Sequence, residues 1–142
     1  MDNARIAVIA AAASVIAWLA KTIAIGVVGG LDQSPLETPL FLAGLLTSMV
    51  AVIAISLART HDRTLFVRVG AALAALATVF AFVAVLNLAI SWIQPPDATW
   101  VWSEINLWVT ALLVLGMAVL TRRRDAAAAT GGSRSSAAIS HV

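Results

Sequence analysis

Residues 16–30 read IAWLAKTIAIGVVGG, an apolar run in which Lys21 is the one charged side chain. The run belongs to a longer apolar segment from Ile6 to Gly29, and about 20 apolar residues suffice for a helix to cross a bilayer. The pair Gly29-Gly30 is typical of a helix end. The stretch therefore predicts a membrane-spanning helix that carries a lysine where a charge is costly.

The composition of the whole chain agrees with a membrane protein. Of its 142 residues, 61% are hydrophobic and 11% are charged, whereas soluble domains average about 25% charged residues. The mean hydropathy is +0.98. So few charges could not cover so much apolar surface in water, which makes lipid the expected solvent. The chain has no cysteine, which excludes disulfides and thiolate metal sites.

Four apolar segments are long enough to span a bilayer. We expect an all-α integral membrane protein whose four transmembrane helices pack as an antiparallel bundle within residues 1–124. Residues 125–142 are rich in Ala, Ser and Gly, and we predict a disordered cytoplasmic tail there. The spans are predicted at about 6–29, 39–58, 65–93 and 98–121.

Short segments with polar residues and prolines that can cap or begin a helix separate these spans. Ser34 and Glu37 fit a capping box that begins the second span, and Thr38 followed by Pro39 offers a second start nearby. Asp97 can cap the fourth span. Because the first apolar run resumes after Lys21 without a clear cleavage site, we expect this segment to be retained and not removed as a signal peptide.

The charges predict the orientation of the chain. The loops at 30–38 and 94–99 hold acidic residues and no basic ones, whereas arginines gather at the opposite ends of the spans. Basic residues concentrate on the cytoplasmic side of short-looped membrane proteins, so we expect both termini in the cytoplasm. These residues also suit anionic lipid headgroups. They are Arg59, Arg63, Arg68, Arg122, Arg123 and Arg124, together with Arg5.

The tryptophans divide into two groups. Trp92, Trp100 and Trp102 flank the second acidic loop, and indole rings favour the membrane–water interface, so they predict an outer aromatic belt. A cage for a cationic ligand is the alternative. Trp18 and Trp108 lie deeper in their spans and are predicted to pack between helices.

Small residues recur at intervals of three and four in three spans, and such stripes let membrane helices approach closely. We expect most of them to build the bundle of the chain itself, with contact to another subunit as the alternative. The stripes are Ala10, Ala13, Ala17, Ala20 and Ala24; Gly44, Ser48 and Ala51; and Gly70, Ala74, Ala77, Ala81 and Ala84.

Polar groups in the outer half of the spans form the candidate site. Lys21 lies about 6–12 Å below the outer end of its span, and Glu104 and Asn87 lie about 9 Å below theirs. Ionisable groups inside a membrane usually face the bundle and pair, so we predict a polar cluster of Lys21, Glu104 and Asn87. The alternatives for Lys21 are snorkelling to the headgroups and pairing with Asp32 or Glu37. Asn106 lies about 200° around the helix from Glu104 and therefore faces a different neighbour.

The sequence contains no phosphate-binding glycine loop, nucleophile elbow or metalloprotease motif. His61 and His141 are too far apart for a metal site. We therefore expect no enzymatic activity, no cofactor, no metal and no nucleic-acid partner. The preferred hypothesis is an accessory or scaffolding subunit of a bacterial plasma-membrane complex that acts through helix contacts with a membrane-protein partner. The alternative is a small homo-oligomeric carrier or channel that uses Lys21 and Glu104.

Overall fold

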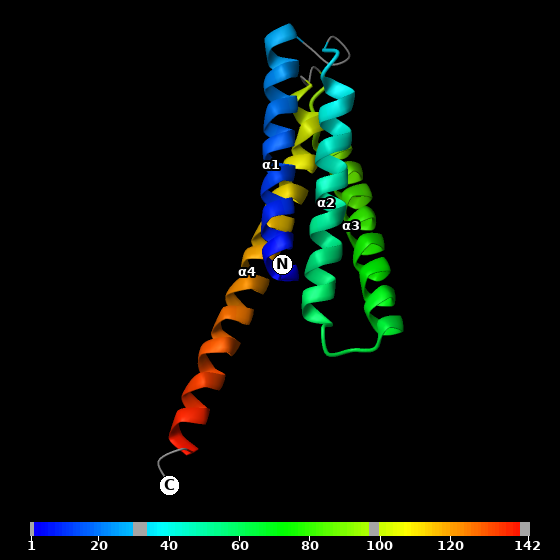
Figure 1. Ribbon diagram of the computed structural model, residues 1–142. Coiled ribbons are helices and arrows are strands. Elements are labelled where there is room, and N and C mark those ends of the chain that lie inside the picture. The colour runs from blue at the N-terminus through cyan, green and yellow to red at the C-terminus, as the bar shows by residue number, and fades with distance from the viewer. Residues whose placement is uncertain (1, 30–33, 97–99, 140–142) are drawn as a thin grey trace.

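The computed structural model of the protein describes residues 2–29, 34–96 and 100–139. The described chain is all-α, with four helices and no strand, and 88% of the residues are helical. Figure 1 shows that successive helices run in opposite directions. The helices are α1 (Asn3–Val28), α2 (Glu37–Arg59), α3 (Leu65–Ile93) and α4 (Val101–Ile139).

All four helices contain a segment long and apolar enough to cross a membrane. The predicted fold class is therefore confirmed, and the chain is a small multi-pass membrane protein. The first three crossing segments coincide with α1, α2 and α3, and the fourth is Glu104–Ala128 within α4. The predicted boundaries of the first three spans differ from the observed helices by three residues at most, because hydropathy marks a span better than its ends.

The helix ends differ from the predicted caps in detail. Asp2 caps α1 by accepting a hydrogen bond from the Ala4 N–H at 3.2 Å, and Gly29 ends that helix with a positive φ of 87°. The predicted capping box of α2 does not form, since Leu36 occupies the N-cap position without a side-chain cap. The Ser34 hydroxyl instead accepts the Leu36 N–H at 3.3 Å in a local turn. The predicted cap at Asp97 lies outside the described residues.

Helix α4 continues well beyond the span predicted to end at residue 121. Its backbone is helical to Ile139, across most of the stretch for which we predicted a disordered tail. The sequence DAAAA at residues 125–129 accounts for part of this difference, because alanine has the highest helix propensity and does not terminate a helix. The long helix leans away from α2 and α3 toward its C-terminal end (Figure 1).

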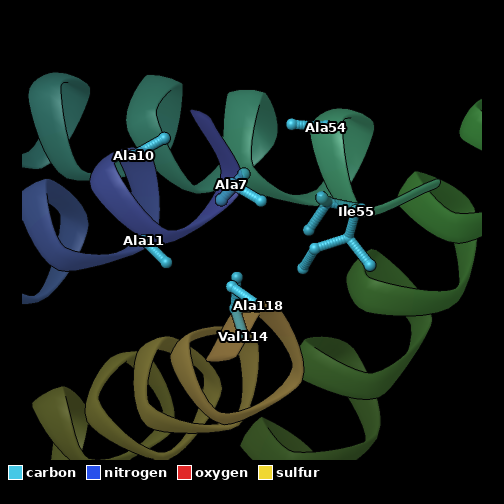
Figure 2. Packing of buried hydrophobic residues seen from close by; sticks show 9 residues of the cluster. Ala7, Ala10, Ala11, Ala54, Ile55, Val114 and Ala118 are labelled. Carbon is cyan, nitrogen blue, oxygen red and sulfur yellow. The ribbon is translucent and has the colours of Figure 1, made fainter. Parts of the chain in front are cut away.

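The buried core joins α1, α2 and α4 and consists mainly of small side chains (Figure 2). Alanines facing one another allow the helix backbones to approach closely, which is the main source of packing energy between helices in lipid. The core residues are Ala7, Ala10, Ala11, Ala51, Val52, Ala54, Ile55, Val114 and Ala118.

A second contact, nearer the middle of the bundle, fixes α1 against α2. The Ser14 hydroxyl donates to the Gly44 carbonyl oxygen at 3.1 Å and lies 2.5 Å from the Ser48 hydroxyl. Gly44 also lies directly under the Trp18 ring, where an added Cβ would come within 2.7 Å of a ring atom. Glycine is therefore required at this position for the close approach of the two helices.

Helix α3 is the least buried part of the bundle. Its buried residues are Ala72 and Ile90, whereas its stripe of small residues is exposed. The stripes of α1 and α2 pack inside the chain, as we expected, but that of α3 faces away from it. We refer to this set as the α3 stripe: Gly70, Ala74, Ala77, Ala81 and Ala84.

Candidate functional site

The centre of the candidate site is an ion pair between α1 and α4. Lys21 Nζ lies 2.6 Å from Glu104 Oε1, and the two side chains are only 5% and 6% exposed. The lysine side chain therefore ends against a carboxylate in the first turn of α4. The structure therefore brings together the two residues that the sequence predicts to pair, and Lys21 does not snorkel.

A second carboxylate approaches the same lysine. Glu37, in the first turn of α2, places Oε1 3.8 Å from Lys21 Nζ, and its side chain is 16% exposed. Lys21 thus lies between carboxylates from two helices, and we call Lys21, Glu37 and Glu104 the ion cluster. Asp32, the other predicted competitor, lies outside the described residues. The Phe41 ring completes one side, with its centroid 5.9 Å from Lys21 Nζ.

Asn87 does not join this cluster. Its side-chain oxygen accepts a hydrogen bond from Asn106 Nδ2 at 3.4 Å, which connects α3 to α4. The helical angle between Glu104 and Asn106 explains the separation, since one faces α1 while the other faces α3. Lys21 therefore pairs with Glu104 and Asn87 pairs with Asn106, in two separate contacts at nearly the same level of α4.

Neighbouring hydrogen bonds fix the position of α1 near the ion cluster. Trp108 Nε1 on α4 donates to the Thr22 hydroxyl at 3.1 Å, and that hydroxyl donates to the Trp18 carbonyl oxygen at 2.9 Å. The Trp18 and Phe41 rings meet edge to face with centroids 5.5 Å apart. Trp18 is 3% exposed, so it packs between helices as predicted.

The ion cluster reaches an open cavity. A cavity of about 380 Å³ adjoins it, lined by Lys21, Ser34, Glu37, Thr38 and Phe41. When all three groups are ionised, one lysine and two carboxylates leave a formal charge of −1. Glu104 Oε2 is buried and has no hydrogen-bond partner among the described residues. That oxygen offers a hydrogen-bond acceptor, and within the described chain no group of three His, Cys, Asp or Glu gathers to hold a metal.

The other predicted residues lie at the two ends of the bundle. Trp92 is 83% exposed at the end of α3, while Trp100 and Trp102 are half-buried at the start of α4. Their role as an aromatic belt stays a prediction. The predicted cytoplasmic arginines (Arg59, Arg63, Arg68, Arg122, Arg123 and Arg124) lie toward the opposite end, where α2 ends, α3 begins and α4 leaves the bundle.

Two contacts outside the ion cluster have weak or absent sequence signals. Arg59 Nε donates to the Thr121 hydroxyl at 3.3 Å, which links α2 to α4 at the arginine-rich end. The contact of Gly44 with the Trp18 ring could not be predicted either, because a glycine in an apolar span can serve several packing roles. No protein-family model, curated protein or solved structure matches this chain.

Proposed function

We propose that this chain is a non-enzymatic accessory or scaffolding subunit of a plasma-membrane complex, with both termini in the cytoplasm, and that it acts through helix contacts. The observation that carries the proposal is the outward-facing α3 stripe. Its members follow one another at intervals of four, three, four and three residues, so they share one face of the helix.

Large apolar side chains flank the α3 stripe. Phe66, Leu73 and Val85 lie three or four residues from its members and are 89%, 63% and 66% exposed, as suits contact with lipid tails. A lipid-facing helix gains nothing from a continuous row of Gly and Ala, whereas a second helix can pack closely along such a row. At Gly70 an added Cβ would meet nothing within 4 Å, so the absence of a side chain there serves no contact within the chain.

The ion cluster has an internal role in this proposal. Lys21 and Glu104 are almost fully buried and point at each other across α1 and α4. A buried pair of this kind is weak evidence of added stability, but it disfavours arrangements in which either charge loses its partner. The pair thereby sets how α1 and α4 align. Because α3 packs against α4, this alignment also affects the position of α3.

The carrier or channel hypothesis is the second candidate, and one observation favours it. Two members of the ion cluster, Lys21 and Glu37, line the 380 Å³ cavity, and the third, Glu104, has a buried carboxylate oxygen without a hydrogen-bond partner among the described residues. A carrier would use that carboxylate to exchange a proton or cation with the cavity. In that case a second copy of the chain is needed to complete a pathway.

The test is purification of the tagged protein from native membranes in a mild detergent, followed by quantitative mass spectrometry. Gly70→Leu places a large side chain in the α3 stripe. Gly116→Leu is the matched control, because Gly116 is also exposed and an added Cβ there also meets nothing within 4 Å.

The proposal predicts a membrane-protein partner in near-stoichiometric amount with the wild-type chain. It also predicts that Gly70→Leu loses this partner and that Gly116→Leu keeps it. Recovery of the wild-type chain alone would contradict the proposal. Recovery as a homo-oligomer would support the carrier hypothesis instead.

A further inference from the structure

A groove opens between α2, α3 and α4 in the half of the bundle that carries the arginines. It has a volume of about 360 Å³ and is almost entirely apolar. Val52 and Ile55 of α2, Val79 and Phe82 of α3, and Leu113 of α4 form its walls. This size and lining are typical of sites that bury an apolar ligand.

The helices create this groove by separating on one side. The amide pair of Asn87 and Asn106 holds α3 to α4 at the far end, and the bond from Arg59 to Thr121 holds α2 to α4 at the near end. Toward its C-terminal end α4 leans away from α3, as Figure 1 shows. At the level of the groove α3 offers small side chains, Ala75 and Thr78, which leave the space unfilled.

Positive charge lies at one end of the groove. Arg59 lines it directly, and the contacts of Arg59 within the described residues are neutral: the Thr121 hydroxyl at 3.3 Å and the Met117 sulfur at 4.0 Å. Arg68 lies two turns before Ala75 on the same face of α3. Its Nε is buried and has no hydrogen-bond partner among the described residues. The nearby acid Asp62 contacts His61, 2.8 Å away, and is exposed.

We propose that this groove binds an anionic phospholipid, with an acyl chain between α2, α3 and α4 and the phosphate at Arg59 and Arg68. An apolar groove that opens sideways within a bilayer meets acyl chains before any other ligand. Guanidinium groups are suited to phosphate because they present several donors in a planar fork. The groove and the two arginines together fit a single amphiphile of negative charge, and this inference does not depend on the proposed accessory role.

The first test uses native mass spectrometry of the purified protein with phosphatidylglycerol or phosphatidylcholine added. We expect Arg59→Gln to weaken phosphatidylglycerol binding about fivefold, because one basic residue near a membrane surface contributes about that factor. Phosphatidylcholine binding should weaken less, because its choline cation offsets the charge of the same phosphate. Arg123→Gln, which removes a charge outside the groove, is the matched control and should have little effect. Ala75→Phe fills the groove and should weaken the binding of both lipids.

Two results would overturn the inference. One is an equal loss of phosphatidylglycerol binding in Arg59→Gln and Arg123→Gln, which would mean a general attraction of the arginine-rich end. The other is unchanged binding in Ala75→Phe. A second measurement needs no variant: phosphatidylglycerol with a photoreactive group in mid-chain should attach to Val79 or Phe82 of the wild-type protein, and attachment elsewhere alone would contradict the site.

Discussion

The buried ion pair gives the sharpest stability prediction. Lys21→Met removes the positive charge and keeps a side chain of similar length. Glu104 would then be buried without a cation, since Lys21 is the one cation within ion-pair distance of it among the described residues. Removal of one partner from a buried pair costs about 3–5 kcal/mol, and we expect the free energy of unfolding to fall by that amount.

Substitution of the partner, Glu104, should lower the free energy of unfolding by less. Glu104→Met leaves Lys21 with Glu37, 3.8 Å away, and with the Phe41 ring at 5.9 Å. We expect a loss of about 1–3 kcal/mol, the usual penalty for a buried polar group with reduced pairing. The double variant Lys21→Met with Glu104→Met buries neither charge and should be as stable as the wild type, or more stable by up to about 4 kcal/mol.

Reversible unfolding in mixed detergent micelles measures these differences, with helix content followed by circular dichroism. The five tryptophans provide a second signal by fluorescence. The reasoning fails if Lys21→Met costs less than about 1 kcal/mol, which is below the range for a broken buried pair. It also fails if the double variant is no more stable than Lys21→Met.

Exchange of the two charges, as Lys21→Glu with Glu104→Lys, should restore expression lost in either single reversal.

Three further predictions concern packing and topology. Gly44→Ala should lower the free energy of unfolding by about 1–3 kcal/mol in the same assay, because the added Cβ would lie 2.7 Å from the Trp18 ring. A variant more stable than the wild type would contradict this contact. Ser14→Ala should cost about 0.6–1.7 kcal/mol, the range for hydrogen bonds between membrane helices, and no change would mean that its bond to the Gly44 carbonyl is dispensable. The chain has no cysteine, so single cysteines can report the topology. Ser34→Cys should react with an impermeant maleimide on intact cells, and His61→Cys should react only after permeabilisation. The opposite pattern would contradict the predicted cytoplasmic location of the termini.

The number and approximate position of the helices could be predicted from the sequence because the bilayer sets a minimum apolar length. The ion pair was predictable for a related reason. A charge is so costly in lipid that Lys21 and Glu104, at similar depth, were expected to pair, although Glu37, 3.8 Å from Lys21 Nζ, lies close enough to compete. The position of Asn87 was less constrained, because an amide can bond to many partners, and it pairs with Asn106.

Helix packing was harder to predict because hydropathy does not separate buried from exposed faces in lipid. Alanine and leucine are accepted both by neighbouring helices and by acyl chains, so α3 has the same apolar character on every side. The sequence therefore showed three stripes of small residues without indicating that those of α1 and α2 are internal and that of α3 is external. The groove at Arg59 was also hidden, since it arises from the lean of α4 and from no local motif.

The most direct test of the account is site-specific photo-crosslinking in native membranes. A photoreactive amino acid at Ala77 would lie in the α3 stripe, and one at Ile16, which is 65% exposed on α1, would serve as the control. The account predicts a discrete adduct with another membrane protein from Ala77 and none from Ile16. Adducts with lipid alone from both positions would contradict the proposed role of α3 as a helix-contact surface.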